Sequence, residues 1–168
     1  MDRSAFTCAV MTVSDKGSRG ERADTSGPQL QHQLAAAHFR IVDYTIVPDQ
    51  PELIRETIVK WVDEEKIDLI ITTGGTGVSP SDRTPEATRG VIDYEIPGIG
   101  EAMRMASFAI TPSAILSRGL GGVRKESLII NLPGSERAAR ENLAVVLPAL
   151  PHALEKIKGG TKDCVAAS

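Results

Sequence analysis

Apolar residues along this chain fall into two patterns, short continuous runs and longer stretches with helical spacing. The short runs predict strands over residues 6–13, 40–47, 67–73, 113–117 and 127–132. The run over residues 67–73 is typical of a strand that a parallel sheet buries on both faces. The helical spacing predicts helices that begin near residues 28, 51, 84, 99 and 135, with prolines at 148 and 151 bending or interrupting the last one before it ends near 156. This alternation predicts an α/β sandwich with a mainly parallel sheet.

Length and composition fit one globular domain, because the chain has 168 residues, of which 41% are hydrophobic and 24% charged. We expect the domain to span residues 1–158 and a flexible tail to follow over 159–168. The net charge of −3, without a Lys/Arg cluster, argues against nucleic-acid or anionic-membrane binding. With no signal pattern and no apolar run of roughly 20 residues, we expect a cytoplasmic protein. Cys8 and Cys164 lie in unlike contexts and predict neither a disulfide nor a zinc site.

A glycine-rich loop follows the most apolar predicted strand. Gly74, Gly75 and Gly77 allow a tight turn whose N–H groups can approach an anion, and Thr73 and Thr76 add hydroxyl donors. Asp82, a few residues further on, is suited to hold Mg²⁺. No Gly-Lys-Ser/Thr follows, so this is not the common ATP-binding loop. The loop predicts a phosphate and metal site, and the alternative is a turn whose glycines only allow a sharp reversal.

Three further loops should join this one, because ligands bind at the carboxyl ends of the strands in an open α/β sheet. They span residues 14–20, 48–49 and 133–136. Asp49 is a second candidate carboxylate, unless it only caps the helix that follows. Gly134 and Ser135 start a helix and can bind an anion, or serve as an ordinary turn and cap. Cations near Ser117, including Arg118, can bind substrate phosphate or lie in solvent.

These segments together resemble the molybdopterin adenylyltransferases. The resemblance rests on residues 72–86 (Thr-Thr-Gly-Gly-Thr-Gly through Asp-Arg-Thr-Pro-Glu), supported by 24–28, 48–49, 97–104, 114–118 and 132–135. It covers nearly the whole chain and points to the MogA type, related to MoaB and to the G domains of gephyrin and the plant Cnx1 protein. The family implies a three-layer α/β/α fold and a homotrimer. Its reaction is the Mg²⁺-dependent transfer of AMP from ATP to molybdopterin, which releases pyrophosphate and primes the pterin for a MoeA-like molybdenum-insertion enzyme.

The resemblance also implies roles for individual residues. Asp49 and Asp82 fall on the two carboxylates linked to catalysis and metal, and Glu86 is expected to support the metal or the loop. The expected nucleotide and phosphate site comprises Thr73, Gly74, Gly75, Thr76, Gly77, Gly134 and Ser135. The expected pterin site comprises Ser14, Ser117 and Arg118.

Three alternatives stay open at this point. The chain could be a MoaB-like relative with the same activity in a hexamer. It could be a carrier that holds molybdopterin without reacting it, although the presence of Asp49 and Asp82 argues against this. It could also resemble the CinA-like hydrolases of nucleotide pyrophosphates, an option weakened by the absence of an additional domain.

Overall fold

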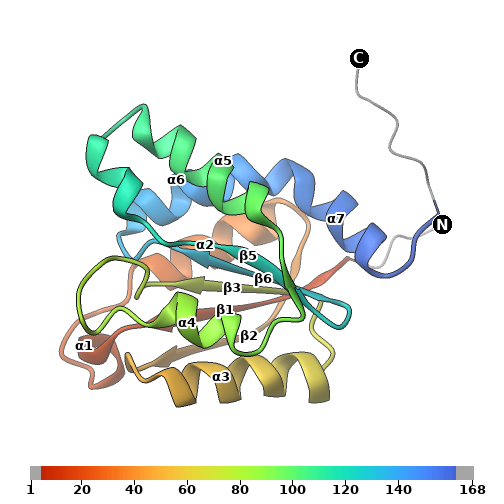
Figure 1. Cartoon of the computed structure of the whole chain (residues 1–168). Helices are drawn as coiled ribbons and strands as arrows, with labels where there is room; N and C mark the ends of the chain where they lie inside the picture. Colours follow the sequence, from red (N-terminus) through yellow and green to blue (C-terminus); the bar gives the residue numbers. More distant parts are fainter. Residues whose placement is uncertain (1–4, 162–168) are drawn as a thin grey trace.

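A six-stranded sheet forms the middle layer of the computed structural model, which describes residues 5–161 (Figure 1). The strands lie in the order β2-β1-β3-β6-β5-β4. β1, β2, β3 and β6 are parallel, whereas β5 and the short β4 pair antiparallel, so the predicted mainly parallel sheet is confirmed. The strand bounds are β1 (Thr7–Val13), β2 (Arg40–Val47), β3 (Leu69–Thr73), β4 (Tyr94–Glu95), β5 (Gly121–Arg124) and β6 (Ser127–Leu132).

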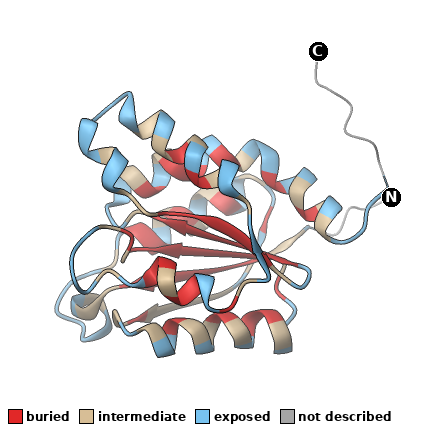
Figure 2. Cartoon of the chain, in the orientation of Figure 1, coloured by how far each residue is buried: buried red, intermediate tan, exposed pale blue. Residues whose placement is uncertain are grey.

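Helices cover both faces of this sheet and complete the three layers. One face packs against α2 (Ser26–Ala36), α5 (Pro97–Phe108), α6 (Glu136–Val146) and α7 (Leu150–Ile157). The other face packs against α3 (Pro51–Val59), its π-helical extension η1 (Lys60–Glu64) and α4 (Thr84–Arg89). The remaining helices are α1 (Asp15–Ser18), η2 (Pro112–Leu116) and η3 (Leu147–Ala149). Figure 2 shows the buried sheet between the two helical layers, which fixes the loops at its carboxyl edge to a rigid support.

The last predicted helix is interrupted where its prolines lie. α6 ends at Val146, a 3₁₀ turn follows over η3, and α7 resumes the helix at Leu150. Pro148 and Pro151 occupy early positions of η3 and α7, where a missing N–H leaves no helical hydrogen bond unmade. The predicted interruption is confirmed.

The predicted strand over residues 113–117 is wrong. This segment forms the 3₁₀ helix η2, in which Ile115 and Leu116 remain exposed. A proline at its first turn favours this conformation because it fixes φ and lacks an N–H. The apolar run there reflects an exposed surface rather than a buried strand.

The sequence predicted neither the short β4 nor β5, and the segment 118–125 was expected to be a connecting loop. β5 occupies residues 121–124 and pairs with β6. Its two glycines conceal the apolar pattern of a strand, and packing requires them to be small. A Cβ at Gly121 would lie 2.6 Å from the Ile99 side chain on α5.

The expectations for the cysteines, the tail and membrane spans can be compared with the structure only over residues 5–161. Cys8 is buried in β1, and burial raises the pKa of its thiol, as expected of a packing residue rather than a reactive one. Cys164 and most of the predicted tail lie outside the described residues. Among residues 5–161, no helix combines the length and the apolar character needed to cross a membrane.

Candidate active site

The four predicted loops meet at the carboxyl edge of the sheet and enclose a cavity of about 370 Å³, named here the carboxylate cavity. Ser14, Asp49 and Asp82 line it, each from a different loop. The strand ends Thr73 and Gly74 and the α6 start at Gly134 and Ser135 complete most of the wall. A fifth segment, residues 22–26, closes the cavity and was not among the four predicted loops.

The turn at Gly74 and Gly75 requires glycine at both positions. Their φ angles are +104° and +69°, in the region that side chains rarely adopt. A Cβ at Gly74 would collide with the Val13 carbonyl, and one at Gly75 with the Thr84 hydroxyl. Thr84 Oγ1 also donates to the Gly74 carbonyl at 2.9 Å. The glycines therefore let the chain turn beside β1 and α4 and keep the turn close to Asp49.

Two expected phosphate donors of this loop have protein partners. The Gly74 N–H donates to the Leu132 carbonyl at 3.1 Å, which continues the pairing of β3 and β6. Thr73 Oγ1 donates to the Pro133 carbonyl at 2.6 Å. These two groups join the glycine turn to the loop before α6, so they position the site rather than offer free donors to it.

Asp49 forms a reciprocal pair with Asp15. The Asp15 N–H donates to Asp49 Oδ2 at 3.0 Å, and the Asp49 N–H donates to Asp15 Oδ1 at 2.9 Å. The N-cap of α3 is Gln50, so Asp49 does not serve merely as that cap. Burial raises the pKa of the Asp49 carboxyl, and the negative charges of Asp15 and Asp82 raise it further, against the lowering effect of the Asp15 N–H. Among residues 5–161, the charges that shift the pKa of Asp49 are those of Asp15 and Asp82, so the site concentrates negative charge.

A second cavity, of about 490 Å³, lies on the other side of the glycine-rich loop. Thr76 and Gly77 line it from the loop, and Arg104 and Asn142 line it from α5 and α6. The two cavities share Asp82, Gly134 and Ser135. Ser135 also caps α6, since its Oγ accepts from the Ala138 N–H at 3.3 Å. Two ligands bound in the two cavities would meet at this shared edge.

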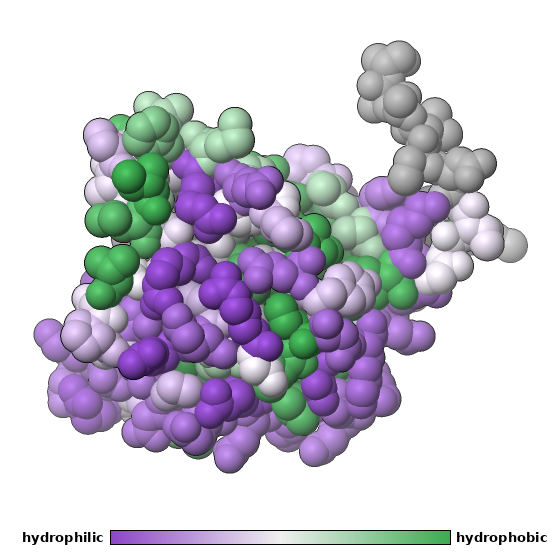
Figure 3. Space-filling view, in the orientation of Figure 1, coloured by the Kyte–Doolittle hydropathy of each residue, from purple (hydrophilic) through white to green (hydrophobic). Residues whose placement is uncertain are grey.

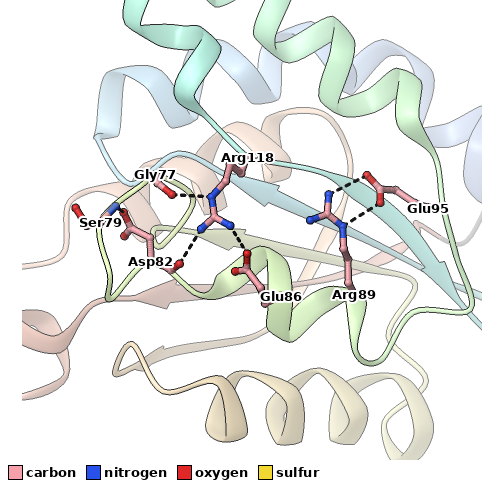
Figure 4. A network of polar contacts seen from close by, with 7 residues as sticks. All are labelled: Gly77, Ser79, Asp82, Glu86, Arg89, Glu95 and Arg118. Atoms are coloured by element: carbon pink, nitrogen blue, oxygen red, sulfur yellow. Dashed lines mark hydrogen bonds and ion pairs between the residues drawn. The ribbon is translucent and has the colours of Figure 1, made fainter.

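The structure separates residues that were expected to share the pterin site. Ser14 lines the carboxylate cavity, Ser117 lines the second cavity, and Arg118 is not among the lining residues of either. Arg118 instead forms an ion pair with Glu86 (Figure 4). Glu86 is likewise not among the residues that line the carboxylate cavity with Asp49 and Asp82.

Asp24 is a cavity residue that lies outside the strand ends and was not predicted. It accepts hydrogen bonds from Thr12 Oγ1 at 2.6 Å, from the Gly27 N–H at 3.1 Å, and from the Tyr44 hydroxyl. Burial, with a further contribution from Asp24, raises the pKa of Tyr44 to about 12. The signal in the sequence was the Asp-Thr-Ser-Gly-Pro segment, which begins a helix here and also brings a carboxylate to the cavity.

Arg104 and Asn142 were also missed, because both lie within helices rather than at strand ends. Arg104 Nη1 donates to the Gly119 carbonyl at 2.7 Å and to the Ser117 carbonyl at 3.3 Å. Asn142 Nδ2 donates to Ser107 Oγ at 3.0 Å. A helical pattern predicts which residues face inward, but it does not predict that a cavity opens between two helices.

The donor set of the carboxylate cavity fits a hard divalent cation such as Mg²⁺. Within residues 5–161, no three His, Cys, Asp or Glu side chains form a ready-made metal cluster. Mg²⁺ commonly binds through one or two carboxylates and completes its shell with water and substrate phosphates. Asp49 and Asp82 supply that number. Burial, and to a lesser extent the charges of Asp15 and Asp82, raise the pKa of Asp49, and a bound cation would favour its charged form.

Comparison with known proteins agrees with this architecture. A family model described as "Probable molybdopterin binding domain" matches residues 9–152. The chain is 44% identical over 152 residues to a molybdopterin adenylyltransferase of Helicobacter pylori, covering 89% of this chain and 86% of the relative. It is 43% identical to gephyrin of Dictyostelium discoideum, covering 95% of this chain and 23% of that protein. A crystal structure of the molybdopterin biosynthesis enzyme MoaB from Thermus thermophilus superposes with a TM-score of 0.87 at 51% identity, over 92% of this chain and 97% of the other.

Proposed function

This chain belongs to the molybdopterin adenylyltransferase family, and from that membership we propose that it transfers AMP from ATP to the terminal phosphate of molybdopterin and releases pyrophosphate. The observation that carries the proposal is the pair of cavities that share Asp82, Gly134 and Ser135. Each cavity takes one substrate, and the reacting phosphates meet at the shared edge. The product then passes to a MoeA-like molybdenum-insertion enzyme in the cytoplasm.

The main obstacle to this reaction is the approach of two anions. The carboxylate cavity itself contains Asp24, Asp49 and Asp82 against a single arginine, Arg22, so a bare triphosphate would be repelled. We assign Asp49 and Asp82 to hold Mg²⁺. When bound, the ion would neutralise phosphate charge and stabilise the transition state. An ionised phosphate is already a nucleophile, so the chain has to align the two groups rather than supply a strong base.

The backbone at the shared edge supports phosphate binding. Ser135 lies at the N-terminus of α6, an 11-residue helix whose dipole favours an anion there. Ser26 Oγ donates to the Gly134 carbonyl at 2.9 Å, which fixes this turn against α2. The edge is thereby held between α2 and α6 before any ligand arrives, as an aligned transfer requires.

A pyrophosphate-release assay with molybdopterin, ATP and Mg²⁺ tests the proposal. We expect release only when all three are present. Molybdopterin binding without release would identify a carrier instead. Release from ATP with no molybdopterin would identify a hydrolase of nucleotide pyrophosphates.

We also propose a homotrimer, supported by an apolar surface patch. Figure 3 shows apolar side chains gathered over the ends of α5 and η2, where Phe108, Ile110, Ile115 and Leu116 are all more than half exposed. A patch of this kind commonly marks a protein–protein interface. Light scattering during size-exclusion chromatography should give three times the mass of the 17.9 kDa chain, and a sixfold mass would favour the hexameric MoaB-like assembly.

A further inference from the structure

The loop that carries Asp82 has little support of its own. Residues 78–81 are exposed, and Val78 is 66% exposed. Two local bonds shape the turn: the Asp82 N–H donates to the Ser79 carbonyl at 2.9 Å, and the Ser79 N–H donates to Asp82 Oδ2 at 3.0 Å. Both bonds lie within the loop, so they define its shape without attaching it to the sheet.

Arg118 provides that attachment. Its N–H donates to the Thr76 carbonyl at 2.8 Å. Its guanidinium donates from Nε to the Gly77 carbonyl at 2.8 Å and from Nη2 to the Asp82 carbonyl at 2.7 Å. One residue thus binds the loop at both ends, from the segment that leads into β5 (Figure 4).

Glu86 holds this guanidinium in place from α4. It accepts from Arg118 Nη1, on the side of the arginine away from Nε. Burial raises the pKa of the Glu86 carboxyl, but its own backbone N–H and Arg118 outweigh that effect and leave the pKa lowered. A charged Glu86 therefore orients a guanidinium whose other nitrogens contact loop carbonyls.

We propose that Arg118 and Glu86 are positioning residues that fix the 76–82 loop and so place the Asp82 carboxylate at the edge shared by the two cavities. This inference rests on the proposed function only for its catalytic consequence. It replaces the expectation that Arg118 binds the pterin, and of the two roles expected for Glu86, support of the metal or of the loop, it selects the loop. A planar guanidinium is required, because a lysine ammonium cannot contact two carbonyls and a carboxylate in this geometry.

Kinetics of Arg118→Ala and Glu86→Ala, measured by pyrophosphate release, test the catalytic consequence. We expect each variant to lower kcat by roughly 10- to 100-fold, since small displacements of an aligned group have effects of this size. Molybdopterin binding, followed by fluorescence titration without ATP, should change by less than about threefold. Arg118→Lys should recover only part of kcat, and the double variant should be little worse than either single one, because both residues act through one contact.

Hydrogen exchange of the 76–83 peptide gives a second readout that does not require activity. Arg118→Ala and Glu86→Ala should both accelerate exchange there while leaving peptides from β3 and β6 protected. Arg89→Ala is the matched control, because Arg89 also lies on α4 and pairs with Glu95, at 3.1 Å, without a contact to the loop (Figure 4). It should change neither kcat nor loop exchange.

The outcomes separate the alternatives. If Arg118 binds the pterin, Arg118→Ala will weaken molybdopterin binding more than tenfold while Glu86→Ala leaves it unchanged, and the proposal is wrong. If Glu86 is a metal ligand, Glu86→Ala alone will raise the Mg²⁺ concentration for half-maximal rate, which also overturns it. Unchanged loop exchange in both alanine variants would refute the positioning role even if the wild-type protein proves to have another activity. An inactive wild type whose loop exchange responds as expected would refute the proposed function alone.

Discussion

Two pairs of aspartates lie at opposite ends of the central sheet, and their charges have opposite surroundings. At the carboxyl end, Asp49 and Asp82 share a cavity, and each lies near another carboxylate. At the amino end, Asp63 accepts from Arg124 Nη2 at 2.7 Å and from Lys125 Nζ at 2.9 Å. Asp68 there accepts from Lys158 Nζ at 2.6 Å and from the Thr7 N–H at 2.7 Å.

The pKa values record this difference. Hydrogen bonds from Arg124 and Lys125 lower the pKa of Asp63 from 3.8 to about 2, despite some loss of hydration. The pKa of Asp49 is raised instead, chiefly by burial. Paired carboxylates join elements of a fold, whereas partly buried carboxylates that lie close together are typical of a functional site. Substitutions at the two ends should therefore affect different properties.

The largest expected effect is on turnover at the carboxyl end. Asp82→Asn preserves the shape of the side chain and an acceptor for the Ser79 N–H, but it removes the negative charge. We expect kcat to fall by roughly 100-fold or more, because the metal would lose a ligand and would then stabilise the developing phosphate charge less well. Pyrophosphate release measures this, and molybdopterin affinity should fall far less than kcat.

Asp63→Asn is the matched control at the amino end and should retain the wild-type kcat. Equal losses of turnover in the two variants would contradict the division between the ends. An equal loss of turnover and pterin affinity in Asp82→Asn would show that Asp82 binds the substrate rather than acting in its reaction.

The carboxyl end was also the part of the molecule most accessible to sequence reasoning. β1, β3 and β6 are largely apolar and β2 is rich in residues that favour strands, and the loops after these strands were correctly expected at one edge. Glycine, serine and aspartate directly after a buried strand are local signals, since the strand direction alone places them at that edge.

Contacts between segments that are far apart in the sequence could not be predicted from local patterns. Arg118 was expected at the site because it lies near a strand end, and Glu86 because of the family resemblance, whereas their contact with each other across 32 positions was not predicted. β5 was hidden by Gly121 and Gly122, which are small because Ile99 and Ile92 pack against them. Periodicity reports which side of an element faces inward, but it does not report which neighbour the side chain meets there.

The next largest effect is on stability at the amino end. Asp63→Asn removes charged hydrogen bonds that join η1 to the β5–β6 turn, and we expect the free energy of unfolding to fall by roughly 1–2 kcal/mol at pH 7. Because the folded pKa is lowered, the stabilisation is present above the unfolded value near 3.8 and is lost as pH falls toward about 2. Urea unfolding at pH 7, 5 and 3 should show the gap between wild type and variant narrowing at pH 3.

A gap that stays constant over this range would mean that Asp63 acts through packing or through its geometry rather than through its charge. The corresponding substitution of Glu52, whose partner Arg55 lies one helical turn away on an exposed face, is a control for a surface ion pair. Glu52→Gln should change the free energy of unfolding by less than about 0.5 kcal/mol.

The smallest expected effect is on stability at the carboxyl end, where the sign of the change shows whether Asp49 stabilises or destabilises the fold. Asp49→Asn should raise the free energy of unfolding at pH 7 without ligands, by up to about 1 kcal/mol, as is common when a functional charge is removed. The folded pKa of Asp49 is raised, so its favourable contribution exists at low pH and is lost as pH rises through that pKa. Asparagine removes the unfavourable charge beside Asp15 and Asp82 but can still accept from the Asp15 N–H.

Adding Mg²⁺ tests whether the aspartates at the two ends of the sheet differ in function. The ion should stabilise the wild-type protein and reduce or reverse the advantage of Asp49→Asn, because a ligand that binds only the folded state stabilises it by an amount that grows with the logarithm of its concentration relative to Kd. Asp63→Asn should respond to Mg²⁺ as the wild type does. If Asp49→Asn proves as destabilising as Asp63→Asn, then Asp49 joins elements of the fold in the same way, and the two ends of the sheet do not differ as their pKa values indicate.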